Sequence, residues 1–96
     1  MKHHILVKYT SAVNDIQKAE LAPEILKLFS HVKEIPGISD VNVYTNCINR
    51  DNRYDLMIVI DMEKNALPDY DDCIWHKQWK SDYSHIIEKK AIFDCE

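Results

Sequence analysis

The sequence predicts an α+β domain of the ferredoxin-like type, in which a four-stranded antiparallel sheet carries two helices on one face. Two observations support this fold class. The apolar pattern runs in the order strand, helix, strand, strand, helix, strand along the chain. The chain has 96 residues, with 46% hydrophobic and 29% charged content, which is typical of one globular domain. Residues 1–96 are therefore expected to form a single domain with a βαββαβ order.

Residues 2–9 and 14–34 predict the first strand and the first helix. Apolar and polar residues alternate over 2–9, as in a half-buried strand. Within 14–34 the apolar residues recur every three or four positions, as in an amphipathic helix that Asn14 or Asp15 caps. Pro23 is expected to kink this helix or to begin a second segment. The residues expected to face the core are His3, Ile5, Val7 and Tyr9 in the strand, and Leu21, Ile25, Leu28 and Val32 in the helix.

Two strands, a second helix and a last strand follow. Ile38–Thr45 alternates loosely, whereas 53–62 is apolar on both faces, which is typical of a central strand. A helical region over 64–85 is interrupted at Pro68 and carries aromatic residues at a spacing of four, a stripe that indicates core packing. The last strand is expected over 86–95. The aromatic stripe consists of Trp75, Trp79 and Tyr83, and the last strand is expected to place Ile87, Ala91 and Phe93 on one face.

In this arrangement both helices cover the same face of the sheet, and the other face is left open. The strand over 53–62 is nevertheless apolar on both of its faces. Because large uncovered apolar surfaces are rare on monomers, we expect a second copy of the chain to cover the open face around a two-fold axis. The sequence therefore predicts a homodimer.

Charge and cysteine content argue against several classes of partner. Sixteen acidic and twelve basic residues give a net charge of −4, which disfavours nucleic acid as a ligand. No apolar stretch has the length of a signal peptide or a membrane span, so neither secretion nor membrane insertion is expected. The three cysteines are too widely spaced for a C-x-x-C zinc pattern, and their odd number does not suggest a disulfide framework. A cytoplasmic protein with reduced thiols is expected.

Four parts of the sequence resemble a known family. They are HHILVKY at 3–9, IPGI at 35–38, YDLMIV at 54–59, and the set of Tyr70, His76, Trp79 and Phe93-Asp94. Together they resemble the stress-responsive dimeric α/β-barrel (Dabb) family over nearly the whole chain. The resemblance implies the same βαββαβ fold and a dimer in which the two sheets form a barrel. It implies less about the reaction, because most members of the family have no assigned activity.

The best-understood relatives in that family are plant polyketide cyclases, in which a tyrosine and two histidines beside a cavity promote an aldol closure. The resemblance assigns these roles to His3, Tyr70 and His76, and Trp79, Ile5 and Leu28 are expected to line the cavity. The family often has His-Pro before the second histidine, where this chain has Cys73-Ile74-Trp75. Six residues of unbroken helix turn by about 600°, so Tyr70 and His76 would point apart. They can converge only if the helix breaks between them.

These residues suffice for acid/base chemistry without a cofactor. A histidine can take a proton near neutral pH, and a tyrosine hydroxyl can donate a hydrogen bond to a developing enolate oxygen. With His76 as the base and Tyr70 as the donor, the predicted activity is enolisation, aldol cyclisation or isomerisation of a small organic molecule. The alternative is a non-catalytic ligand-binding or stress-response protein that uses the same cavity only to hold a ligand.

Two other interpretations are less favoured by the sequence. A metal site could combine His3, His4 and His76, but adjacent residues of a strand face opposite sides of the sheet. Cys73 lies three residues before His76 and could act as a nucleophile, but no third group can be named that would orient such a pair. Neither a metal nor another cofactor is therefore expected.

Overall fold

The computed structural model describes all 96 residues and contains one four-stranded antiparallel sheet with the strand order β2-β3-β1-β4. The elements in chain order are β1 (Lys2–Tyr9), α1 (Asp15–Ser30), β2 (Ile38–Thr45), β3 (Leu56–Met62), α2 (Leu67–Asp71), α3 (Ile74–Tyr83) and β4 (Ile87–Cys95). Short 3-10 turns at His31–Glu34, Lys64–Ala66 and Ser84–Ile86 connect them. This confirms the predicted ferredoxin-like fold, with the second helix divided in two.

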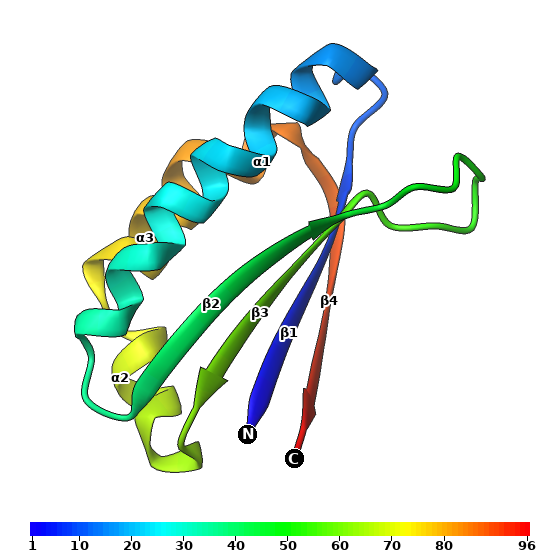
Figure 1. Cartoon of the computed structure of the whole chain (residues 1–96). Coiled ribbons are helices and arrows are strands. Elements are labelled where there is room, and N and C mark those ends of the chain that lie inside the picture. The colour runs from blue at the N-terminus through cyan, green and yellow to red at the C-terminus, as the bar shows by residue number, and fades with distance from the viewer.

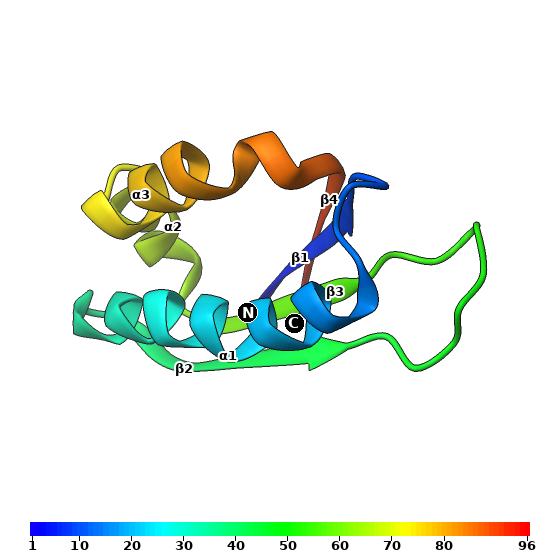
Figure 2. The same ribbon diagram turned by 90° about the horizontal axis from the view of Figure 1, so that it is seen from above.

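All the helices lie on one face of the sheet, and no element covers the other face (Figure 1). Seen from above, α1 runs along β2, while α3 lies on the side of β4 (Figure 2). The two termini lie close together at one end of the sheet, where Lys2 pairs with Cys95, and the loop between β2 and β3 extends beyond the other end (Figure 1). None of the helices has the length and apolar character that crossing a membrane requires.

The core lies between the sheet and the helices. Every second residue of β1 is buried, from His3 to Tyr9, as the alternation predicts. Phe29 of α1 meets Trp79 of α3 edge-on, with 5.1 Å between the ring centroids. Trp79 and Tyr83 are buried, so these two members of the aromatic stripe belong to the core as expected. Trp75 is only half-buried and stacks on the ring of His31.

The helix α1 is continuous through Pro23, which therefore does not begin a second segment. The helix begins with a capping box. The side chain of Asn14 accepts a hydrogen bond from the Gln17 N–H, and the side chain of Gln17 accepts one from the Asn14 N–H, both at 2.8 Å. This reciprocal pair satisfies two backbone donors at the start of the helix.

A β-bulge changes the predicted face of one residue in β4. The register between β1 and β4 shifts between Lys8 and Tyr9, so that Tyr9 lies opposite Ile87. Ile87 therefore shares the core face with Tyr9, whereas Ala91 and Phe93 lie on the open face. The expectation that all three share one face is wrong, because alternation over the sequence does not count the extra residue of a bulge.

The open face of the sheet carries a band of apolar side chains across all four strands. Leu6 of β1 lies opposite Met57 on one side and Ala91 on the other, and Tyr44 of β2 lies opposite Met57. The side chains of Tyr44 and Phe93 are 52% and 61% exposed. This band is the uncovered apolar surface that the sequence predicts.

Gly37 adopts a backbone conformation that other residues rarely adopt. It precedes β2 with a φ of +94°, and a Cβ atom there would lie 3.1 Å from the Cβ of Ala66. We expect Gly37→Ala to lower the free energy of unfolding by about 1–3 kcal/mol, because backbone strain and this close contact both act in the folded state. Urea denaturation measures the effect, with Ser39→Ala at a nearby exposed position as the control. Equal midpoints for the two variants would contradict the prediction.

Candidate active site

A cavity of about 380 Å³ lies between the β1–β4 half of the sheet and the helices α2 and α3. This volume is large enough for a small organic ligand. Five of the six residues that the sequence assigns to the site line it: His3, Tyr70, His76, Trp79 and Ile5. The sixth, Leu28, lies in a separate cleft between α1 and α3. The expectation for Leu28 is wrong because α1 directs Ile25 and Phe29 into the core and leaves Leu28 half-buried beside α3.

Tyr70 and His76 meet because the chain breaks the helix between them. The helix α2 ends at Asp71, and α3 begins at Ile74. Cys73 caps α3, since its Sγ accepts a hydrogen bond from the His76 N–H at 3.3 Å. The break brings the rings of Tyr70 and His76 to 4.8 Å between centroids. The cysteine thiol thus has a structural partner in the backbone of His76.

His3 approaches Tyr70 from the sheet. Its side chain is buried, and the two rings meet edge-on with 5.4 Å between centroids. The Nδ1 of His3 lies 2.5 Å from Oδ1 of Asp94, which is the residue directly opposite His3 in the β1–β4 register. Because a carboxylate accepts the hydrogen bond, Nδ1 carries a proton and donates it.

His76 has the same arrangement with a different partner. Its Nδ1 donates a hydrogen bond to the carbonyl oxygen of Asp71 at 3.0 Å, which leaves Nε2 free in the neutral ring. Burial lowers the pKa of His76 below its ordinary 6.5, and the charge of Lys80 lowers it further, although the hydrogen bond to Asp71 opposes both. His76 is therefore predominantly neutral at pH 7 and can accept a proton.

The hydroxyl of Tyr70 is buried and has no hydrogen-bond partner. The residue is only 1% exposed, and burial raises the pKa of Tyr70 well above its ordinary 10. The hydroxyl therefore stays protonated and remains a donor. A buried polar group without a partner costs about 1–3 kcal/mol, and a polar atom of a bound ligand can supply the missing partner.

His4 does not join this cluster. It lies on the open face of the sheet, where its Nδ1 is 3.0 Å from the carbonyl oxygen of Phe93 and its ring packs edge-on against that of Phe93. His3 and His4 therefore face opposite sides of the sheet, as the strand alternation predicts. No group of three or more His, Cys, Asp or Glu side chains is arranged to hold a metal ion.

Four further charged residues line the cavity and were not assigned to it from the sequence: Asp71, Asp94, Lys80 and Lys90. The strand register could have predicted that Asp94 belongs to the site, because antiparallel pairing of the first and last strands puts it opposite His3. Lys80 follows His76 by four residues, a spacing that puts two side chains on the same face of a helix. Lys90 precedes Asp94 by four residues and shares its face of the strand.

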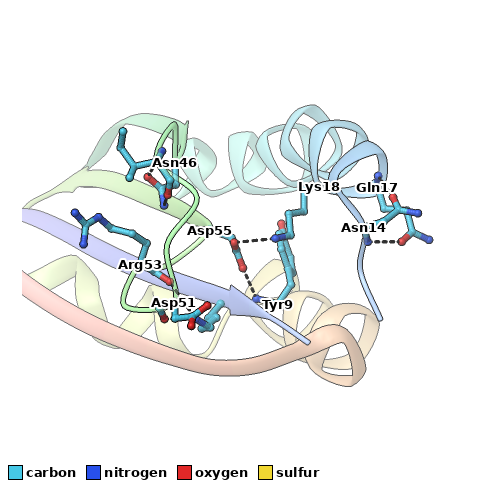
Figure 3. A network of polar contacts seen from close by, with 10 residues as sticks. Tyr9, Asn14, Gln17, Lys18, Asn46, Asp51, Arg53 and Asp55 are labelled. Atoms are coloured by element: carbon cyan, nitrogen blue, oxygen red, sulfur yellow. Dashed lines mark hydrogen bonds and ion pairs between the residues drawn. The ribbon is translucent and has the colours of Figure 1, made fainter. Parts of the chain in front are cut away.

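A second cavity of about 340 Å³ lies at the opposite end of β1 and is lined partly by the loop between β2 and β3. Figure 3 shows its polar network, in which Asp55 accepts hydrogen bonds from the Tyr9 N–H at 2.9 Å and from Nζ of Lys18 at 3.1 Å. The Tyr9 hydroxyl is buried without a partner, and burial raises the pKa of Tyr9 to about 12. No histidine lines this cavity, so it lacks the imidazole bases of the first.

Solved structures with the same fold cover nearly the whole chain. A dimeric protein of unknown function from Bacteroides fragilis, with a ferredoxin-like fold, aligns with a TM-score of 0.79 at 18% identity, over 99% of this chain and 93% of that one. A Dabb family protein from Mesorhizobium loti aligns with a TM-score of 0.64 at 14% identity, over 99% and 93%. A hydroxynitrile lyase from Passiflora edulis aligns with a TM-score of 0.69 at 10% identity, over 96% and 87%. No protein-family model and no curated protein matches the sequence. At these identities the likeness establishes the fold.

Proposed function

We propose that this chain, as one domain of the Dabb type, is a cytoplasmic acid/base enzyme that acts on a small enolisable carbonyl compound without a cofactor. One observation carries the proposal: the buried Tyr70 hydroxyl has no partner and its ring lies beside two imidazole rings. Both imidazoles are held through Nδ1, and the Nε2 of His76, whose pKa is lowered by burial, is free to accept a proton. A hydrogen-bond donor beside a proton acceptor is what enolisation requires.

In the proposed reaction, the carbonyl oxygen of the substrate accepts a hydrogen bond from Tyr70. The Nε2 of His76 removes a proton from the carbon next to the carbonyl group, and the electron pair of that C–H bond moves toward the carbonyl oxygen to form an enolate. The enolate then regains a proton at carbon or attacks a second carbonyl carbon in the same molecule. His3, oriented by Asp94, is the second group able to transfer a proton.

The proposal includes a homodimer that forms through the open face of the sheet. Several solved structures with this fold are described as dimeric. The exposed apolar side chains of Tyr44 and Phe93 lie on that face and support the same assembly. The hydroxynitrile lyase from Passiflora edulis supports the chemistry, since it is a lyase with the same fold.

We expect the rate of α-proton exchange to rise with pH through the pKa of His76 and to reach its plateau before pH 7. His76 must be neutral to act as a base, and burial lowers its pKa below 6.5, so the inactive protonated form disappears before neutrality. Proton NMR in D₂O measures the exchange between pH 5 and 8, with phenylpyruvate and phenylacetone as substrates. Phenylpyruvate has a carboxylate where phenylacetone has a methyl group. Titration of the imidazole resonances gives the pKa of His76 directly.

His76→Gln is expected to remove the pH-dependent exchange, whereas His85→Gln, at an exposed position outside the cavity, leaves it unchanged. A midpoint above pH 6.5, or a profile that survives His76→Gln, would contradict the role of His76. Binding of either ketone in the cavity without exchange would overturn catalysis and support the alternative, a protein that only holds a carbonyl ligand.

A further inference from the structure

We infer that the cavity takes an organic anion, whose carboxylate binds at the end formed by Lys80 and Lys90. The inference rests on the proposed function of the same site, but it concerns the charge of the ligand and not the reaction. A carbonyl group of this ligand would meet Tyr70, and its apolar part would lie against Ile5 and Ile92.

Both lysines lack a partner within the chain. Lys80 of α3 and Lys90 of β4 line the cavity, and neither side chain forms an ion pair or a hydrogen bond within the chain. Four other lysines are each paired with a carboxylate: Lys2, Lys18, Lys64 and Lys77. Two lysines without an ion pair, from different elements, thus line the cavity that also contains Tyr70, whose hydroxyl has no partner.

Two carboxylates, Asp71 and Asp94, line the same cavity as the two lysines. Asp94 is already engaged by the Nδ1 of His3. The charge of Lys80 lowers the pKa of His76 more than the carboxylate of Asp71 raises it, and Lys90 adds to the lowering. With Asp94 held by His3, the two lysines face one remaining carboxylate in the cavity, that of Asp71.

The strand register separates the two ends of the cavity. Lys90, Ile92 and Asp94 lie on the same face of β4, opposite Val7, Ile5 and His3 of β1. Four residues of strand put about 13 Å between the Cα atoms of Lys90 and Asp94, and the two isoleucines lie between them. This order of groups fits a molecule that is anionic at one end and apolar along its length.

Binding of benzoylformate and of its methyl ester tests the inference. Benzoylformate has no hydrogen on the carbon next to its ketone, so it cannot enolise, and the ester differs by the loss of the charge. Amide shifts of the ¹⁵N-labelled protein give both dissociation constants. We expect the acid to bind more tightly than the ester. Lys80→Gln and Lys90→Gln are each expected to weaken binding of the acid about threefold to fivefold, as for an ion pair near the surface, without changing binding of the ester.

Lys89→Gln is the matched control. Lys89 is the neighbour of Lys90, but it lies on the opposite face of the sheet over the ring of Tyr54, so the same loss of charge is expected to leave both constants unchanged. Equal affinity for acid and ester, no binding of the acid, or an equal loss with Lys89→Gln would overturn the inference. Benzoylformate could bind tightly and depend on the two lysines while the α-protons of phenylpyruvate do not exchange. This result would support the anion site and overturn only the proposed catalysis.

Discussion

Tyr70→Phe is expected to produce a protein that is more stable and almost inactive. The substitution removes a buried hydroxyl that has no hydrogen-bond partner, so the free energy of unfolding rises by about 1 kcal/mol. It also removes the donor to the enolate oxygen, so exchange of the phenylpyruvate protons slows about 100-fold, as for the loss of one oxyanion donor. Urea denaturation and proton NMR in D₂O measure the two effects on the same sample.

Tyr9→Phe separates stability from activity. Tyr9 carries the other buried hydroxyl without a partner, but it lines the second cavity, at the opposite end of β1 (Figure 3). We expect this variant to gain a similar stability and to keep the full rate of exchange. If the Tyr70→Phe variant exchanges the substrate protons at the wild-type rate, Tyr70 has no role in the reaction. A loss of stability in Tyr70→Phe would mean that its hydroxyl has a partner in the folded protein.

The Tyr70 hydroxyl lowers the stability of the free protein because it is buried without a hydrogen-bond partner. A folded chain satisfies most of its buried polar groups, so removing an unsatisfied hydroxyl removes a cost. Tyr70 is fully enclosed, since the break at Cys73 turns α3 and brings His76 against its ring. In the proposed reaction, the carbonyl oxygen of the substrate supplies the missing partner and recovers this stability.

The fold could be predicted from the sequence because it depends on local spacing. The alternation of Ile5, Val7 and Tyr9 fixes which side of β1 meets the helices, and the aromatic spacing of Trp79 and Tyr83 fixes the core side of α3. These patterns need no knowledge of what lies across the core. They fail at Ile87, where a bulge adds one residue, and at Leu28, where the rotation of α1 depends on its contact with α3.

The site could be predicted only in part, because its geometry depends on contacts between distant segments. The sequence shows that Tyr70 and His76 need a break between them, but the cap that forms it is a cysteine, a residue type that rarely signals the start of a helix. Asp94 meets His3 only through the pairing of the first and last strands. This register joins two segments at opposite ends of the chain, so the pattern within either segment does not reveal it.

Replacing Phe93 and Tyr44 together by lysine is expected to convert the proposed dimer into a monomer. Both side chains are more than half exposed on the open face, so the fold of the single chain should tolerate the change. In a two-fold dimer each substitution occurs twice, so four unpaired charges would enter an apolar interface. Burying unpaired charge is costly enough that we expect the dissociation constant to rise by at least about 100-fold.

Light scattering at micromolar concentration measures the result, since the dimer has twice the 11.3 kDa mass of the chain. The control is Ile16→Lys, which places a lysine at a 71% exposed apolar residue of α1, away from the open face. We expect this control to remain dimeric, because it changes hydrophobicity and charge without touching the sheet. A monomeric wild-type protein, or a double variant that stays dimeric, would mean that the open face is not the interface, and the apolar band across the four strands would then need a different partner.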